Sequence, residues 1–283
     1  MKKSATMNNQ KVWFITGASK GIGLTLTQYL LKKGNKVIST SRTLEGLTKN
    51  ITENTENFLP LEVDITSDAA VKESIEKGIS HFGQIDVVVN NAGYSLVGSM
   101  EEMTDEEFRK TLDVNLFAAV NVMRNIIPHF RKQESGHIIN ISSNAGYVGF
   151  ANASSYNAAK FGLIGISEAL FKELEPFGIK VTAVAPGQFR TNFMNKDSMK
   201  FVQNRIEAYG VDKAEIMWRD YSGKQIGDPQ KLAGVLYQIS LMKNPPKRLL
   251  LGPDTYDLVT EQFKETLAEF EEWKHLTLST NFD

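Results

Sequence analysis

The distribution of apolar and polar residues along the chain predicts short buried strands that alternate with longer amphipathic helices. Strands are expected at residues 12–16, 36–40, 58–63, 85–89, 137–141, 180–185 and 248–251. Helices are expected at 21–32, 67–82, 104–131, 155–173, from 229 onward and at 254–274. The last helix carries apolar residues at intervals of three and four, namely Tyr256, Val259, Phe263, Leu267, Phe270 and Trp273.

This alternation is typical of a parallel sheet with helices on both faces. Because parallel crossovers are right-handed, the predicted fold is a single-domain α/β doubly wound parallel sheet of about seven strands. We expect the domain to cover residues 10–283, after a flexible N-terminal tail at 1–9. The stretch from about 188 to 227 falls outside the alternation, and its length favours a substrate lid.

Composition and charge exclude several classes of function. The 283 residues carry 32 lysines and arginines against 33 acids, so no global basic field exists for a nucleic-acid partner. Cysteine is absent, and the four histidines lack metal-ligand spacing, so we expect no metal site. No apolar run approaches the ~18 residues of a membrane helix, which favours a cytoplasmic protein without a membrane partner. Paired acids such as Glu101 and Glu102 are expected on solvated helix faces.

A glycine-rich turn follows the first strand, in the order Thr16-Gly17-Ala18-Ser19-Lys20-Gly21-Ile22-Gly23. Glycines let backbone amides approach a pyrophosphate, and the N-terminus of the next helix favours negative charge. The spacing differs from the G-x-G-x-x-G fingerprint and from a P-loop. The alternative is a turn that serves only helix–strand packing.

Five motifs in order resemble the short-chain dehydrogenase/reductase family, whose domain is a Rossmann fold. They are the glycine-rich turn, Asn90-Asn91-Ala92-Gly93, Ser143, Tyr156-x-x-x-Lys160, and Pro186-Gly187 followed by Thr191. The resemblance covers residues 11–191, and beyond them it extends only to general architecture. It implies a nicotinamide cofactor held by Gly17, Ser19, Lys20, Gly21, Ile22, Gly23, Ser41, Arg42, Asp64, Ile65, Asn90, Ala92, Gly93, Tyr156, Lys160, Pro186, Gly187 and Thr191.

The tip of the second strand bears on the choice of cofactor. A carboxylate there would accept hydrogen bonds from the ribose of NAD, whereas a cation would pair with the 2′-phosphate of NADP. This strand ends without an acid and is followed by Arg42, which can contact a phosphate through two donors. With Lys20 as a second cation, we expect NADP(H) to be preferred over NAD(H). The alternative is that both are solvated surface charges, and Glu45 lies close by.

Four residues are the candidate catalytic groups. Tyr156 and Lys160 are four apart in a helical segment and so share a face. A phenol with a pKa near ~10 needs a neighbouring cation to become a usable acid and base. We therefore expect Lys160, together with the cationic nicotinamide ring of an oxidised cofactor, to lower the pKa of Tyr156. By resemblance, Tyr156 donates the proton, Ser143 positions the carbonyl, and Asn115 supports a water-mediated proton path to Lys160.

Residues that follow the strands supply candidate walls for a substrate. They are Ser95, Leu96, Ser143, Tyr147, Gln188, Phe189 and Phe193. This mainly apolar set predicts an uncharged carbonyl or secondary alcohol as substrate, reduced or oxidised by an NADP(H)-dependent oxidoreductase. The alternatives are a non-catalytic NADP(H)-binding sensor and an NAD-dependent epimerase or dehydratase. The helix at 155–173 is rich in small residues, and the family pairs this helix between subunits, which implies a homo-oligomer, a dimer or a tetramer.

Overall fold

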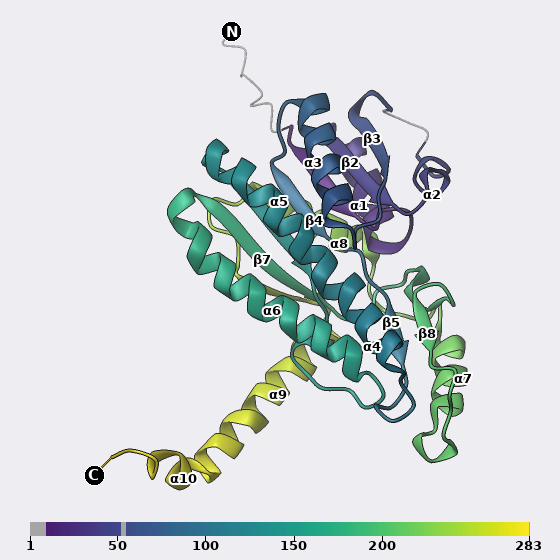
Figure 1. The fold of residues 1–283 in the computed structure, drawn as a ribbon, viewed down its shortest axis with the longest axis vertical. Coiled ribbons are helices and arrows are strands. Elements are labelled where there is room, and N and C mark those ends of the chain that lie inside the picture. The colour runs from purple at the N-terminus through teal and green to yellow at the C-terminus, as the bar shows by residue number, and fades with distance from the viewer. Residues whose placement is uncertain (1–9, 52–54, 283) are drawn as a thin grey trace.

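A computed structural model describes residues 10–51 and 55–282, so the predicted tail at 1–9 lies outside the described residues. Seven parallel strands form one sheet in the order β3-β2-β1-β4-β6-β7-β9 (Figure 1). Their bounds are Val12–Thr16 (β1), Lys36–Ser41 (β2), Phe58–Glu62 (β3), Val87–Asn90 (β4), Gly136–Ile141 (β6), Ile179–Pro186 (β7) and Arg248–Leu251 (β9). The order reverses between β1 and β4, as in a doubly wound sheet, so the predicted fold class is confirmed.

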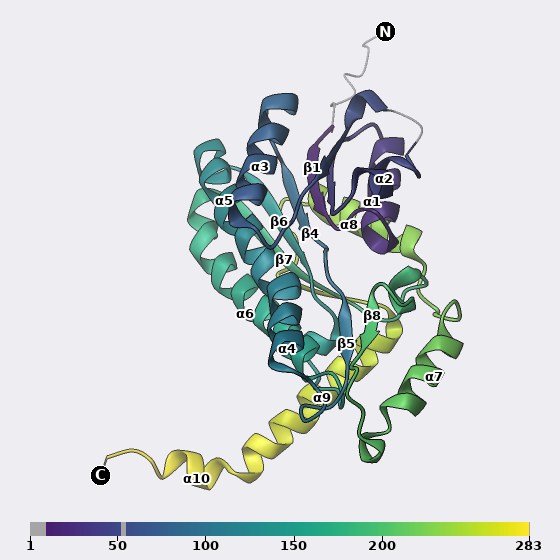
Figure 2. The same cartoon turned by 45° about the vertical axis from the view of Figure 1, so that its right-hand side comes forward.

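Helices cover both faces of the sheet (Figures 1 and 2). On one face lie α1 (Gly21–Lys32), α2 (Leu44–Thr48) and α8 (Pro229–Leu241), and on the other α3 (Asp68–Phe82), α5 (Ala118–Gln133) and α6 (Ser154–Leu174). The remaining helices are α4 (Asp105–Leu112), α7 (Val211–Tyr221), α9 (Pro253–Glu272) and α10 (Lys274–Leu278). Side chains place helix starts where expected: Ser67 caps α3, and Asp228 caps α8 ahead of a proline.

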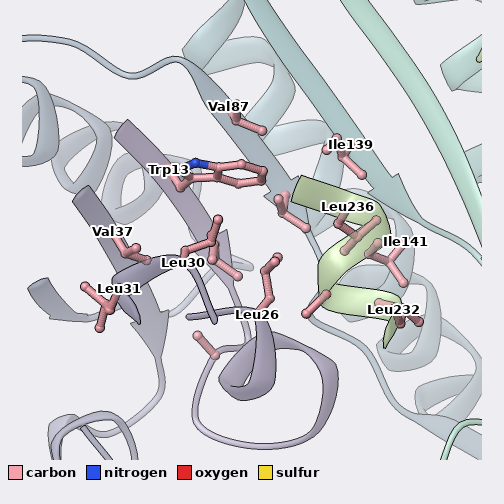
Figure 3. Close-up of a cluster of buried hydrophobic side chains, with 14 of the residues drawn as sticks. Trp13, Leu26, Leu30, Leu31, Val37, Val87, Ile139, Ile141, Leu232 and Leu236 are labelled. Atoms are coloured by element: carbon pink, nitrogen blue, oxygen red, sulfur yellow. The ribbon is translucent and has the colours of Figure 1, made fainter. Parts of the chain in front are cut away.

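The central strand β1 shows why the sheet is buried on both sides. Successive side chains point to opposite faces, so Trp13 joins the cluster under α1 and α8, while Phe14 joins the cluster under α3, α5 and α6. Figure 3 shows Trp13 packed with Leu26 of α1 and Leu236 of α8. A strand with two buried faces reads as a continuous apolar run, which is the pattern observed here.

The helix predicted at 104–131 is interrupted. Thr104 and Glu107 form the expected capping box at the start of α4, but residues Asp113–Phe117 form a π-helical turn before α5 begins. Inside this turn the Asn115 side chain donates to the carbonyl of Thr111 at 2.9 Å. An α-helix would use that carbonyl for the backbone amide of residue 115, so the side chain competes with the regular ladder.

The segment 188–227 has more regular structure than a loop. It contains α7 and a short strand, β8 (Met199–Phe201), which pairs in parallel with β5 (Ser95–Val97). Its side chains form a separate buried cluster together with Leu96 and Val97 of β5, and the members from the segment are Met194, Met199, Phe201, Val202 and Val211. Both ends of the segment are tied together, because Gly227 donates to Gln188 at 2.9 Å and Arg190 donates to Gly227 at 2.8 Å.

The expectation that Glu102 lies on a solvated face is wrong. The side chain is 1% exposed and its carboxylate accepts from the backbone amides of Ser99 at 2.9 Å and Ile206 at 2.7 Å. These hydrogen bonds and the nearby Arg205 keep the pKa of Glu102 below its usual range although burial opposes them. Glu102 thus fastens the 188–227 segment to the chain that follows β5.

Candidate active site

The glycine-rich turn and the segment after β4 are held together by close packing and by hydrogen bonds between side chains and backbone. Gly17 has a φ of +66°, and a Cβ atom on it would lie 2.7 Å from the Cα of Ala92. The Thr16 hydroxyl accepts from the amides of Asn91 and Ala92 at 3.0 and 3.1 Å. The Asn91 side chain donates back to the carbonyls of Thr16 and Gly17 at 2.9 and 3.1 Å. Two of the predicted cofactor motifs therefore form one unit.

The first turn of α1 is suited to an anion. Lys20 occupies the N-cap in an extended conformation, no side chain caps the helix, and the first turn contains no acid. Its amides are therefore free of side-chain acceptors, and the helix dipole favours negative charge there. Thr191 lies above this turn, since a Cβ on Gly21 would be 3.8 Å from the Cβ of Thr191. These features fit the pyrophosphate of a dinucleotide.

The two predicted phosphate-binding cations have different surroundings. Arg42 is exposed beyond the end of β2 and makes no hydrogen bond or ion pair with any residue in the described ranges. The Thr66 hydroxyl and amide hold the pKa of Asp64 below its usual range, and the charge of Arg42 adds to that effect. Lys20, in contrast, lies 3.6 Å from the Asp197 carboxylate of the 188–227 segment.

Three of the four candidate catalytic residues meet around Gly93. A Cβ on Gly93 would lie 2.5 Å from Oδ1 of Asn115 and 3.6 Å from Nζ of Lys160. Lys160 Nζ donates to the carbonyl of Ile141 at 2.9 Å and lies 5.6 Å from the centre of the Tyr156 ring. The π-helical turn holds Asn115 in this position, where its Oδ1 also accepts from the Tyr94 amide at 3.0 Å.

Ser143 completes the group after the end of β6. Its hydroxyl donates to Asn144 Oδ1 at 3.0 Å and accepts from the Ala145 amide at 3.2 Å. Burial raises the pKa of Tyr156 to about 12, and the Ser143 hydroxyl opposes that rise. Burial also lowers the pKa of Lys160 to about 8. The surroundings of Tyr156 thus raise the pKa of its phenol, because desolvation outweighs the Ser143 hydroxyl. The expected lowering also depends on the cationic nicotinamide ring of an oxidised cofactor.

The predicted substrate walls are only partly brought together. Phe193 lies beside Tyr156, with ring centres 6.4 Å apart. Tyr147 instead packs edge-on against Phe263 of α9 at 6.0 Å. The others are mainly occupied inside the protein: Ser95 and Leu96 are buried in β5, Phe189 packs on the core under α1 and α8, and Gln188 accepts from the Tyr221 hydroxyl at 2.6 Å.

The remaining predicted cofactor residues lie at the carboxyl edge of the sheet, with different side-chain roles. Ile22 packs against the core, and the Asn90 amide points inward to donate to Asn140 at 2.8 Å. The Ile65 carbonyl accepts from Asn121 at 3.2 Å, and Ser19 packs beside Gly46. Gly187 follows Pro186 and donates to the Leu251 carbonyl at 2.8 Å.

Sequence reasoning missed two residues that hold this edge. The Asn157 side chain donates to the carbonyls of Ala145 at 2.8 Å and Val148 at 2.7 Å, and it accepts from the Phe150 amide at 3.1 Å. It thereby clamps the loop that follows Ser143. The Asp254 carboxylate accepts from the Gln188 amide at 2.8 Å. An asparagine inside the predicted helix was the available signal for Asn157, since such side chains favour backbone partners.

Comparison with known proteins places the chain in a family. Residues 11–200 match the family model described as short chain dehydrogenase. The chain belongs to the short-chain dehydrogenase family. Oxidoreductase BOA17 of Botryotinia fuckeliana is 35% identical over 95% of this chain and 99% of that protein. The 3-ketodihydrosphingosine reductase of Bacteroides thetaiotaomicron is 36% identical over 86% of this chain and 88% of that protein.

Solved structures agree with this assignment. A short-chain dehydrogenase from Streptomyces avermitilis has a TM-score of 0.88 and 33% identity, covering 96% of this chain and 99% of that one. Among further short-chain dehydrogenase-like structures, ElxO was solved with NADP bound and a 3-ketoacyl-(acyl-carrier-protein) reductase from Brucella melitensis with NADH. The chain is therefore an NAD(P)-dependent oxidoreductase acting on CH–OH or C=O groups, as expected from its motifs.

The part of this short-chain dehydrogenase that the structure describes holds neither a metal cluster nor a membrane-spanning helix. Across residues 10–51 and 55–282, no group of three or more histidines and acids is placed to hold a metal ion. None of the helices in those ranges combines the length and apolar character that crossing a membrane requires.

Proposed function

We propose that this short-chain dehydrogenase uses NADP(H) in preference to NAD(H) to interconvert an uncharged carbonyl and a secondary alcohol. The observation that carries the cofactor preference is Arg42, an exposed residue next to a strand end that lacks a carboxylate. Within the described ranges its guanidinium makes no hydrogen bond or ion pair, although its charge acts on Asp64. A planar, always charged guanidinium suits a phosphate. ElxO, which is 29% identical, was solved with NADP bound.

The residues around Gly93 divide the chemical work in this proposal. A nicotinamide held at this edge would supply the hydride for the carbonyl carbon in the reducing direction. Tyr156 holds a proton at neutral pH, because burial raises its pKa to about 12, and gives it to the carbonyl oxygen. The Ser143 hydroxyl orients that oxygen. Tyr156 becomes a phenolate when it gives up the proton, and Lys160, whose Nζ lies 5.6 Å from the ring centre, stabilises that charge.

Asn115 has a positioning role in this scheme. Its side chain is committed to the Thr111 carbonyl and the Tyr94 amide, at 2.9 and 3.0 Å. These bonds fix the π-helical turn against Gly93 and Lys160. We infer that the turn presents backbone groups to a water chain that returns a proton to Lys160.

The substrate belongs to an apolar class in this proposal. Phe193 is the wall residue that lies beside Tyr156, and it comes from the start of the 188–227 segment, which acts as the lid. A lid whose side chains pack together with those of β5 can cover a substrate and exclude water. A relative that is 36% identical is named 3-ketodihydrosphingosine reductase, an enzyme of a long-chain ketone, which agrees with an apolar site.

A fluorescence titration tests the cofactor proposal. NADPH should bind at least about tenfold more tightly than NADH, equivalent to ~1.4 kcal/mol. Arg42→Ala should remove most of that difference, because it removes the phosphate's guanidinium partner. Arg131→Ala, at the exposed C-terminal end of α5, is the matched control and should leave both affinities unchanged. Equal binding of the two cofactors to the wild-type protein would overturn the preference.

Turnover tests the chemistry separately. With NADPH and a panel of apolar ketones, Tyr156→Phe should lower kcat by at least about 100-fold, the low end of general acid catalysis. The affinity for NADPH should stay within about twofold. A protein that binds NADPH but turns over none of these ketones, with Tyr156→Phe equal to wild type, would instead indicate a cofactor-binding sensor.

A further inference from the structure

The C-terminal arm, defined as residues 253–282, extends away from the rest of the molecule (Figures 1 and 2). It contains α9 and α10, and it is anchored near its beginning, where Thr255 is 0% and Val259 is 1% exposed. From there the helix continues outward into solvent. An extended helix this far from its own core needs another surface to order it, since isolated helices are marginal in water.

One side of the arm is apolar, and its exposure increases with distance from the body. The stripe begins at buried Val259 and continues with Phe263, which is 49% exposed and touches Tyr147. Further out, Leu267 is 63% and Phe270 is 64% exposed. The part of the stripe that packs on the body is thus continuous with the part that no other residue of the described chain covers.

The uncovered apolar surface of the arm reaches the upper limit for monomers. On α9 and at its end the exposed residues are Phe263, Leu267, Phe270 and Trp273, and α10 adds Leu276 and Leu278, each between 49% and 64% exposed. Together they present on the order of 600 Å² of apolar surface, at the upper limit for a monomeric protein. Two such arms in a symmetric pair would bury about 1,200 Å², which is the size of a specific interface.

Charge distinguishes among possible partners for this face. The sequence from 253 onward holds eight acids and two lysines, whereas residues 1–252 hold 30 basic and 25 acidic residues. By helical spacing most acids of α9 lie away from the apolar stripe, while Glu269 and Glu271 flank it. An acidic helix is repelled by anionic lipid surfaces, which attract basic ones. The same charge distribution is complementary to the body of this chain, which carries the opposite net charge.

We propose that the apolar stripe of the C-terminal arm packs against the body of a second copy of this chain, with the two arms exchanged reciprocally. In both views the arm points toward the side of the molecule on which α5 and α6 lie, so a copy facing that side would be within its reach. A two-fold pair uses the same surfaces twice, so each body receives one arm.

Sedimentation velocity with matched variants tests this interface. The wild-type protein should form a dimer or larger species at micromolar concentration. Leu267→Glu combined with Phe270→Glu should shift it to a smaller species and raise the dissociation constant at least tenfold. Lys264→Gln combined with Ala268→Glu makes the same change in charge on the polar side and should keep the wild-type assembly. A monomeric wild type at 50 μM, or an assembly indifferent to the first pair, would overturn the proposal.

Site-specific crosslinking tests the partner directly, because the chain has no cysteine to interfere. Leu267→Cys carrying a benzophenone maleimide should give a covalent dimer on irradiation, linked to the body of the other copy. Glu265→Cys, on the polar side, should give far less. Links only within one chain would contradict the exchange. Cosedimentation of the wild type with phosphatidylcholine–phosphatidylserine vesicles, lost in the glutamate pair, would assign the stripe to a membrane instead.

This inference stands apart from the proposed function. Leu267 and Phe270 lie outside the residues assigned to cofactor or substrate. The glutamate pair should therefore bind NADPH with wild-type affinity, and circular dichroism should show the same helix content. Failure of the interface with intact NADPH binding, or the reverse, can thus be told apart.

Discussion

The glycine-rich turn and the 188–227 segment lie near each other but are held by different kinds of contact. The turn is held by backbone approaches that leave no room for one additional carbon, as at Gly17 against Ala92. The segment is held by long side chains: Arg219 donates to the carbonyl of Met194 at 2.9 Å and contacts the face of Phe201. The first arrangement provides a rigid cofactor site, and the second provides a surface that can change with the substrate.

The largest expected effect comes from adding a side chain at Gly17. In Gly17→Ala, the new Cβ would meet Ala92 at 2.7 Å while the residue keeps a φ of +66°. We expect the free energy of unfolding to fall by about 3 kcal/mol, because overpacking and backbone strain add. NADPH affinity should fall at least about 100-fold, or ~2.7 kcal/mol.

Gly34→Ala is the matched control for that substitution. Its φ is +76°, but a Cβ there has nothing within 4 Å. Only the backbone strain of about 1 kcal/mol applies, and NADPH binding should be unchanged. Thermal unfolding and a fluorescence titration measure both quantities. Equal losses in the two variants would show that close packing at the turn is unimportant.

The pH dependence of reduction should report Lys160. Burial lowers its pKa to about 8, so the protonated form is lost as the pH rises through 8, while Tyr156, with a pKa of about 12, keeps its proton. The value of kcat/KM should therefore fall about tenfold per pH unit above pH 8, since kcat/KM reports the free enzyme. In Lys160→Arg the residual activity should lack this limb, because arginine stays charged. A limb that begins only above pH 10 would contradict the assignment.

Asn157 tests whether the loop after Ser143 must be held as rigidly as the glycine-rich turn. Asn157→Ala removes three hydrogen bonds to residues 145–150. We expect kcat to fall about 10- to 100-fold because Ser143 loses its orientation, with NADPH affinity unchanged. Asn125→Ala removes one hydrogen bond to Asp68 of α3 and one to the Asn121 carbonyl, so it should lower stability without changing kcat. Steady-state kinetics with a ketone separates the two outcomes.

A smaller effect is expected from loosening the 188–227 segment. Arg219→Met removes donors to the carbonyls of Met194 and Met199. The KM for the ketone should rise about tenfold, or ~1.4 kcal/mol, while the affinity for NADPH changes little. Lys213→Met on the same helix is exposed and should change neither value. A parallel loss of NADPH affinity in Arg219→Met would show that the two regions are not separable.

The smallest expected effect concerns the contact between the two regions. Asp197→Asn removes the acid 3.6 Å from Lys20, and both side chains are substantially exposed. Exposed ion pairs contribute little, so NADPH should bind only about twofold more tightly as Lys20 is freed for phosphate. The gain should disappear in 1 M salt, where such interactions are screened. An unchanged affinity at low salt would remove Lys20 from the phosphate site.

The strands and the doubly wound parallel sheet could be predicted because they depend on local patterns. Apolar runs such as 12–16 and the glycine spacing are readable without knowing any distant partner. The family motifs pointed to Ser143, Tyr156 and Lys160. The burial that raises the pKa of Tyr156 depends on the whole fold, so no motif reveals it.

The features that were missed depend on long-range partners or on very short elements. The strands β5 and β8 have three residues each, which is too short for a periodicity to appear. Glu102 is buried because its acceptor oxygens meet the amide of Ile206, 104 residues away. The π-helical turn arises from one side-chain bond of Asn115, which no helical pattern encodes.

The pairing of Gln188 and Arg190 with Gly227 makes the intervening residues a cassette. Chain entry and exit are fixed at one point, so a replacement of different length would start and finish in the same place. The entropy of closing a loop grows only slowly with its length. Exchange of the part of this cassette beyond Thr191 between homologues could therefore alter substrate range without disturbing the dinucleotide site, which makes it a natural unit for grafting and for evolutionary divergence.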